Sequence, residues 1–206
     1  MGKSWSLWYR IARFVLRWFF FTPLGGFKVL GVERVPLEGP LIVAPVHLSL
    51  LDPPSVGTAL PRGLRFMAKE ELFRFKPFAA LIRSLGSFPV RRGSSDTEAI
   101  RRAIAELEQG HAVLVFPEGT RNDGKTMRPI NRGVAMLAKR TGANVLPVGL
   151  CGTNRVFGRT VVCFGHPFTF AETAGRGDAK QDAEAFSETL RERVLAATRE
   201  AGLNLE

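Results

Sequence analysis

The chain is organised around residues 41–52, which read LIVAPVHLSLLD. The first six are apolar and rich in β-branched side chains, which predicts a buried strand that delivers His47. Asp52 follows five residues later, directly before two prolines. A regular helix would set the two side chains about 140° apart, and a fully extended chain would hold them roughly 16 Å apart. We therefore expect the chain to turn between His47 and Asp52, with Asp52 outside a helix that starts near Pro53 or Pro54.

A histidine held by a carboxylate has a definite chemistry. The carboxylate orients one ring nitrogen, and the other can take a proton from a hydroxyl as a general base. The Gly-x-Ser-x-Gly pattern of serine hydrolases is absent from the sequence, so the proton would belong to a substrate. Taken alone, however, a His–Asp pair is more often a hydrogen-bonded structural histidine.

Three further stretches change that balance. Residues 116–121 read FPEGTR, residues 86–93 read GSFPVRRG, and the run VLPV at 145–148 is followed by Gly152-Thr153. With the His-x4-Asp pattern, and in this order, they resemble the glycerolipid acyltransferase family between about Gly31 and Gly165. The hexapeptide is the most specific of these marks. One departure is that many members carry Asn before the histidine, where this chain has Val46.

The resemblance implies roles for particular residues. His47 is the catalytic base and Asp52 its orienting partner. Glu118, Gly119, Thr120 and Arg121 help to shape a glycerophosphate pocket, together with the motif arginine matched to Arg92. Without the resemblance, Glu118 and Arg121 would be read as a structural ion pair, and the arginine clusters as solvated surface.

Two predicted helix starts lie beside these clusters. Ser95 to Glu98 fit a capping box, and Asn131 is suited to cap a helix that ends at Gly142. Backbone N–H groups at helix starts, with arginines nearby, are suited to bind phosphate.

The expected activity is that of an O-acyltransferase that forms phosphatidate from 1-acylglycerol 3-phosphate. The acyl donor would be acyl-CoA or acyl-carrier protein, and the acceptor a lysophospholipid. We expect no cofactor, no metal and no nucleic-acid partner. Three alternatives remain open: the same chemistry on glycerol 3-phosphate or a lyso-aminolipid, a hydrolase in which His47 activates water, and a non-catalytic basic membrane-binding module.

The N-terminal segment differs from the rest of the chain. No acidic residue occurs before Glu33, and the five basic residues among the first 28 supply half of the formal net charge of +10. On a helix, Lys3, Arg10, Arg13 and Arg17 fall within an arc of about 80°, with aromatic and aliphatic residues around the remainder. This pattern favours an amphipathic helix lying in a lipid interface. We expect residues 1–27 to anchor the chain peripherally to anionic phospholipid on the cytoplasmic face of the cell membrane.

Residues 28–206 are expected to form the acyltransferase domain, an α/β fold with a largely parallel β-sheet covered by helices, like that of glycerol-3-phosphate acyltransferases. Strand-like and helix-like runs alternate along it. The predicted strands are 28–30, 41–46, 64–68, 87–90, 113–116, 145–150 and 161–164. The predicted helices are 54–60, 78–84, 96–109, 132–141 and 182–201.

The length of 206 residues suits one globular domain. Cys151 and Cys163 both lie in apolar runs and are read as small buried hydrophobic residues, which favours a reducing compartment.

Overall fold

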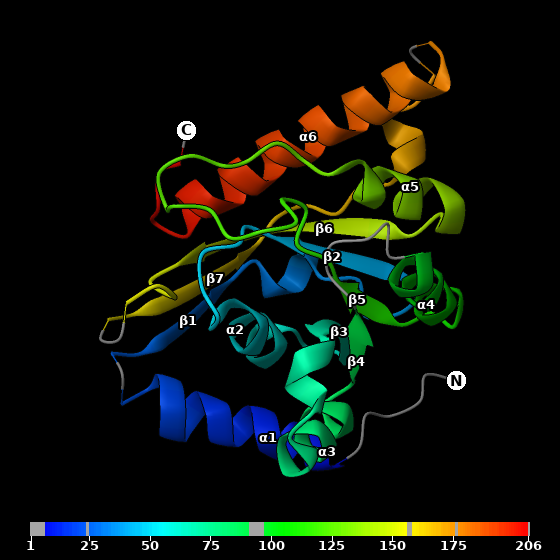
Figure 1. Cartoon of the computed structure of the whole chain (residues 1–206). Coiled ribbons are helices and arrows are strands. Elements are labelled where there is room, and N and C mark those ends of the chain that lie inside the picture. Colours follow the sequence, from blue (N-terminus) through cyan, green and yellow to red (C-terminus); the bar gives the residue numbers. More distant parts are fainter. Residues whose placement is uncertain (1–6, 24, 91–96, 156–157, 176, 206) are drawn as a thin grey trace.

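The computed structural model describes residues 7–23, 25–90, 97–155, 158–175 and 177–205. Within these ranges, seven strands form one sheet in the order β1-β7-β6-β2-β5-β3-β4 (Figure 1). The strands are β1 (Phe27–Leu30), β2 (Leu41–Pro45), β3 (Leu64–Lys69), β4 (Ser87–Val90), β5 (Ala112–Leu114), β6 (Asn144–Cys151) and β7 (Thr160–Phe164). Neighbouring strands are parallel, except that β6 and β7 run antiparallel. The prediction of a largely parallel sheet is confirmed.

The strand directions bring the sequence motifs to one edge of the sheet. Strands β2 to β6 all end at the same edge, called here the carboxyl edge, whereas β1 and β7 run the opposite way. In the centre of the sheet, Leu41 of β2 pairs with Ala112 of β5 on one side and Asn144 of β6 on the other. The segments that follow these three strands, which carry three of the motifs, therefore meet at the carboxyl edge, where open α/β sheets bind their ligands.

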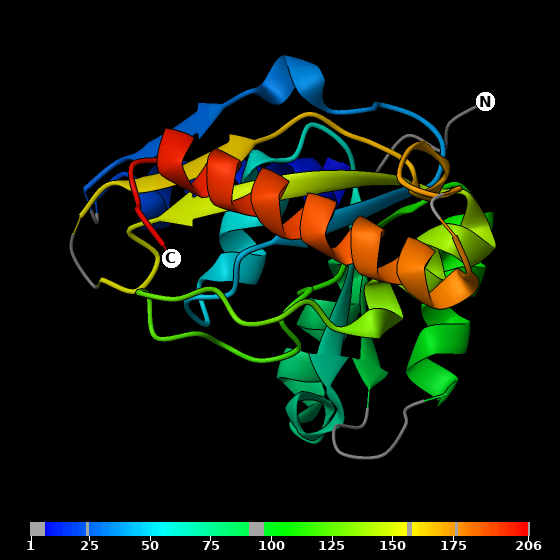
Figure 2. The same ribbon diagram turned by 90° about the horizontal axis from the view of Figure 1, so that it is seen from above.

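Helices cover both faces of the sheet. Helices α5 and α6 lie on one side, and α1, α2 and α3 lie on the other (Figure 1). The helices are α1 (Leu7–Val15), α2 (Asp52–Ala59), α3 (Lys76–Ser84), α4 (Thr97–Glu108), α5 (Arg132–Thr141) and α6 (Ala179–Glu200). Figure 2 shows α6 running across β6, and a glycine permits this close approach. A Cβ at Gly149 would lie 2.2 Å from the backbone of Ala197.

The ends of α5 and α6 follow from their capping residues. The side chain of Asn131 accepts a hydrogen bond from the N–H of Gly133, and Gly142 closes α5 with φ +62°, as predicted. Helix α6 starts three residues earlier than the predicted 182, because the side chain of Asp178 caps the N–H groups of Lys180 and Gln181. Its inward stripe of Phe186, Leu190, Val194 and Ala197 is buried, which confirms its role as a cover.

Two local predictions were wrong. Asp52 is not outside the following helix but is the first residue of α2. Its N–H donates to the carbonyl of Ser49 and its side chain is fixed by several donors, which outweighs the preference of a residue before proline for an extended conformation. Strand β5 ends at Leu114 rather than at residue 116.

The described part of the N-terminal segment begins with α1, which continues into a π-helical turn, η1 (Leu16–Phe21). Tyr9 and Phe21 are buried against the rest of the fold, at 4% and 1% exposure. Lys3 and Trp5 lie outside the described residues, as do Ser95 and Asp96 of the predicted capping box. In the part of the chain that the structure describes, no helix has both the length and the apolarity needed to cross a bilayer.

Candidate active site

The predicted His–Asp pair is formed directly after β2. His47 Nδ1 lies 2.8 Å from Asp52 Oδ2, and the same carboxylate oxygen accepts the backbone N–H groups of Leu48 at 2.6 Å and Ser49 at 2.7 Å. His47 is 6% exposed and Asp52 is fully buried. The loop between the two residues thus wraps around one oxygen, and the predicted turn is confirmed.

The hexapeptide loop holds the backbone of His47 on both sides. Glu118 Oε1 accepts the N–H of His47 at 2.9 Å, and the N–H of Asn122 donates to the carbonyl of His47 at 2.8 Å. Glu118 is itself fixed, because its Oε2 accepts the Asn122 side-chain amide at 2.8 Å and the N–H of Arg128 at 2.9 Å. We call Glu118 and Asn122 the backbone clamp of His47.

A third contact from this loop fixes the plane of the imidazole. The ring of Phe116 stacks on that of His47, with centroids 3.7 Å apart and an interplanar angle of 20°. The turn after Phe116 requires a glycine, because Gly119 has φ +70° while its N–H donates to the carbonyl of Phe116. Pro117 accepts a hydrogen bond from the N–H of Asn131, which ties the loop to the start of α5.

This arrangement suits proton abstraction by His47. A carboxylate at Nδ1 favours the tautomer that carries its proton there, which leaves Nε2 as the proton acceptor. Asp52 can also stabilise the imidazolium that forms. Among the described residues, no group of three or more His, Cys, Asp or Glu side chains is placed to hold a metal ion.

The other predicted site residues fall into three groups. Thr120 and Arg121 are exposed on the loop that holds His47, and Gly119 is exposed beside them. Glu118 is buried and turned toward the His47 backbone, and among the described residues no ion pair joins it to Arg121. Arg92 lies outside the described residues, as does Arg91. The predicted contacts of Arg92, Thr120 and Arg121 with substrate stay predictions.

Sequence reasoning missed Asn122 and the stacking of Phe116. Asn122 is 9% exposed, and its backbone N–H and side-chain amide connect the loop to His47 and to Glu118. Its only sequence signal is a polar residue directly after the hexapeptide, which does not by itself predict burial.

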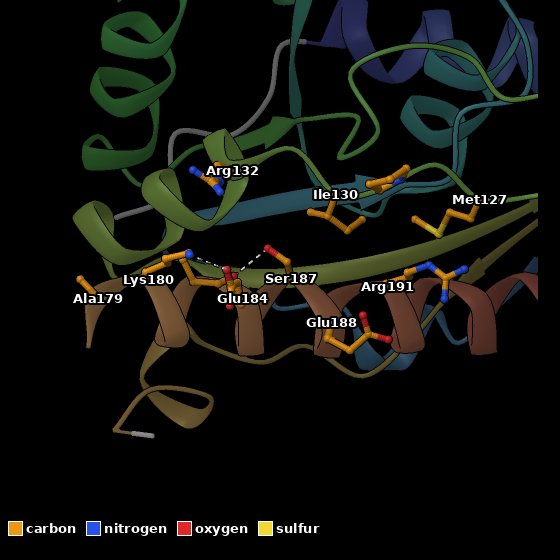
Figure 3. Close-up of a pocket in the computed structure, with 11 residues that line it drawn as sticks. Met127, Ile130, Arg132, Ala179, Lys180, Glu184, Ser187, Glu188 and Arg191 are labelled. Carbon is orange, nitrogen blue, oxygen red and sulfur yellow. Dashed lines mark hydrogen bonds and ion pairs between the residues drawn. The ribbon is translucent and has the colours of Figure 1, made fainter. Parts of the chain in front are cut away.

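A groove of about 730 Å³ lies apart from these residues, between α6 and the chain that enters α5 (Figure 3). Met127, Ile130 and Arg132 line one wall, and Lys180, Ala183 and Arg191 of α6 line the other. Lys180 Nζ lies 4.0 Å from Glu184 Oε1, so part of its charge is balanced within the groove. None of the predicted site residues that the structure describes lines it, and it is not the site of the His–Asp pair.

Comparison with known proteins agrees with this geometry. Residues 26–151 match the family model described as Acyltransferase. The chain is 29% identical over 176 residues to the 1-acyl-sn-glycerol-3-phosphate acyltransferase of Bacillus subtilis, covering 82% of this chain and 87% of that protein. It is 32% identical over 112 residues to the lyso-ornithine lipid O-acyltransferase of Pseudomonas aeruginosa, covering 54% of this chain and 43% of that protein.

A solved structure shows the same fold. The crystal structure of the 1-acyl-sn-glycerophosphate (LPA) acyltransferase PlsC from Thermotoga maritima aligns with a TM-score of 0.75 and 28% identity, covering 94% of this chain and 78% of that chain. The matched segment of the family model contains the His–Asp pair and the whole backbone clamp. The chain belongs to the acyltransferase family.

Proposed function

We propose that this chain transfers a fatty acyl group to the free hydroxyl of 1-acylglycerol 3-phosphate, forming phosphatidate, with acyl-CoA or acyl-carrier protein as the donor. The observation that carries the proposal is the His47–Asp52 pair, 2.8 Å apart, held by the loop that bears the family hexapeptide. The Bacillus and Thermotoga relatives are named for acyl transfer to this acceptor, which supports the choice.

The reaction requires one proton to move twice. His47 Nε2 takes the proton of the acceptor hydroxyl as its oxygen attacks the thioester carbon. The tetrahedral intermediate then collapses, the carbon–sulfur bond breaks, and the imidazolium returns the proton to the leaving thiolate. Asp52 stabilises the imidazolium, while the stacked Phe116 ring and the backbone clamp keep the imidazole in place. A general base in this position contributes about 10²–10⁴ in rate.

We assign the acceptor phosphate to Arg92 and Arg121. A guanidinium matches a phosphate dianion with two parallel hydrogen bonds, and Arg121 is exposed on the loop that holds His47. Glu118 serves the same pocket indirectly, through the backbone that it binds.

A lyso-aminolipid is the second candidate acceptor. The Pseudomonas relative, which is named for a lyso-ornithine lipid, supports it. Glycerol 3-phosphate remains a third choice with the same chemistry.

A thiol-release assay on the purified chain separates these possibilities. It compares 1-acylglycerol 3-phosphate, a lyso-ornithine lipid, glycerol 3-phosphate and no acceptor, each with acyl-CoA and with acyl-carrier protein. We expect release that depends on 1-acylglycerol 3-phosphate. Equal release without acceptor would mean a hydrolase, and no release with any pair would favour a membrane-binding module.

We further propose that α1 binds the cytoplasmic face of the cell membrane in plane. Its inward face carries Tyr9 and Arg13, whereas five exposed apolar side chains lie within an arc of about 120° on the other side of the helix. They are Leu7, Trp8, Ile11, Phe14 and Val15, between 43% and 71% exposed. An apolar outer face is the reverse of an ordinary surface helix and suits a lipid interface.

The predicted basic stripe needs one correction. Arg13 does not face lipid, because its Nε and one terminal nitrogen donate to the carbonyl of Thr58 at 3.2 and 3.1 Å. Of the described cations in the stripe, Arg10 and Arg17 are exposed and remain candidates for anionic headgroups.

A further inference from the structure

A second group of exposed apolar side chains lies outside the N-terminal segment. Strand β3 ends at the carboxyl edge and continues into a 3-10 turn, η3 (Glu70–Phe73), and then α3. Along this segment Leu72 is 45% exposed, Phe75 69%, Phe78 39% and Leu81 43%. Ala79, at 1% exposure, marks the inward face of α3. We call the four exposed residues the η3–α3 patch.

The patch shares a side of the molecule with α1. Both helices lie on the side of the sheet away from α5 and α6 (Figure 1). The indole of Trp8 in α1 donates to the hydroxyl of Ser84 at the end of α3, at 3.0 Å. The proposed lipid-facing surface of α1 therefore adjoins the helix that carries the patch.

The patch also reaches toward the catalytic residues. Leu72 and Phe75 follow the end of β3, and His47 follows the end of β2, both at the carboxyl edge. Leu50, in the turn between His47 and Asp52, is 76% exposed. A partner that binds the η3–α3 patch would therefore lie close to His47.

The charges around the patch decide between possible occupants. Lys69, Arg74, Lys76 and Arg83 are exposed within or beside it, against Glu70 and Glu71. Arg83 lies over the ring of Phe73, with its guanidinium carbon 5.1 Å from the centroid. An apolar strip bordered by an excess of cations would repel a second copy of itself, whereas it complements an anionic lipid surface.

We propose that the η3–α3 patch is a second membrane-docking element, which with α1 sets the carboxyl edge against the bilayer. Insertion of its side chains among the acyl chains would orient His47 toward an acceptor that resides in the membrane. This inference rests on the proposed lipid acceptor and goes beyond the proposed anchor, since it assigns membrane contact to the catalytic domain itself.

The test uses a double variant and a matched control in the full chain. Leu72→Ser with Phe75→Ser removes two exposed side chains of the patch. Val32→Ser with Leu37→Ser removes side chains of similar exposure, 45% and 66%, which flank the opposite edge of the sheet. Partition is measured by sedimentation with vesicles of phosphatidylglycerol and phosphatidylcholine. Turnover is measured with a vesicle-embedded acceptor and with a short-chain monomeric one.

We expect the patch variant to lose about tenfold or more in partition coefficient, since each tenfold corresponds to about 1.4 kcal/mol and two apolar side chains are removed. Turnover should fall on the embedded acceptor and stay unchanged on the monomeric one, and the control should match wild type. Phe75→Gln alone, at a 69% exposed position, gives the same direction if the double variant is unstable.

Two results would overturn the proposal. One is a patch variant that partitions like wild type. The other is a wild-type dimer in sedimentation equilibrium that the patch variant dissociates, which would assign the patch to a second copy. If wild type fails to turn over either acceptor, the proposed reaction falls, but the partition measurement still decides the fate of the patch.

Discussion

At the scale of single residues, the base depends on one carboxylate oxygen. Asp52 Oδ2 accepts from the His47 ring and from two backbone N–H groups, so the same atom shapes the turn and orients the imidazole. An asparagine with its carbonyl oxygen in the place of Oδ2 can still accept all three N–H groups, but it carries no negative charge to stabilise the imidazolium. Its NH₂ group would take the place of Oδ1, which is buried without a hydrogen-bond partner.

Asp52→Asn should therefore lose activity while it keeps its fold. We expect kcat to fall by about 10²–10⁴, as for loss of a general base, with little change in the circular dichroism spectrum. Steady-state kinetics beside thermal unfolding check this. A variant with near-normal kcat would remove Asp52 from the mechanism.

Two residues of the hexapeptide, Glu118 and Arg121, should have different effects when they are substituted. Glu118→Gln replaces one acceptor oxygen by a donor that faces the Asn122 amide and the N–H of either His47 or Arg128, which costs about 1–3 kcal/mol for a buried unsatisfied group. It should lower both the unfolding temperature and kcat.

Arg121→Gln, at an exposed position, should keep stability and raise the KM of the acceptor more than that of the thioester. A Glu118→Gln protein with normal stability and a raised acceptor KM would contradict its role in holding His47. An Arg121→Gln protein with lowered stability and normal KM would contradict its role in binding the acceptor.

The His–Asp pair could be predicted from the sequence because both partners lie in one short stretch. The backbone clamp could not, since Glu118 and His47 are 71 positions apart and their contact depends on the pairing of β2 with β5. A resemblance identifies Glu118 as a site residue, but not which of its neighbours it binds. The same holds for Phe116 over the imidazole.

At the scale of elements, apolar periodicity predicted all seven strands and the six described α-helices, with ends displaced by a few residues. The displaced ends have local causes, such as the cap that Asp178 provides for α6. What periodicity could not predict is which side of α1 faces the fold. Arg13 is turned inward because the last turn of α2 offers it the carbonyl of Thr58.

Arg13 and Arg10 should thus differ although they lie on one helix. Burial lowers the pKa of Arg13, and its bonds to Thr58 fix α1 on α2. Arg13→Gln should lower the unfolding temperature, corresponding to about 1–3 kcal/mol for lost hydrogen bonds of a charged group. Arg10→Gln should leave stability unchanged and weaken binding to anionic vesicles only. Differential scanning calorimetry and vesicle sedimentation separate the two, and equal effects would contradict this orientation of α1.

The two cysteines should differ in reactivity. Cys163 in β7 is fully buried, and burial raises the pKa of its thiol to about 12, whereas Cys151 at the end of β6 is half-buried. Because the thiolate is the reactive form, an aromatic disulfide reagent at mild alkaline pH should modify Cys151 much faster. Mass spectrometry over time checks the order. Equal rates in the folded protein would mean that β7 opens readily.

At the scale of the whole molecule, the fold gathers three of its motifs at one edge and places the exposed apolar residues of α1 and of the η3–α3 patch on one side. The net charge of +10 favours approach to anionic lipid, and such attraction weakens as salt rises. The net charge of the sequence predicts attraction to anionic lipid, but not which side of the molecule faces the membrane. That side depends on the placement of α1 beside α3, which rests on tertiary contacts such as that of Trp8 with Ser84. Removal of residues 1–27 is a poor test of membrane binding, since it would also take away the buried Tyr9 and Phe21.

The central claim is that His47 is the base of an acyl transfer to a lipid hydroxyl. It is tested most directly by the rate of acceptor-dependent thiol release in His47→Ala, with both substrates saturating and the unfolding temperature measured in parallel. We predict a fall of about 10²–10⁴ in a protein that still folds, because the proton acceptor is lost. A folded His47→Ala protein that kept more than about a tenth of the wild-type rate would contradict the claim.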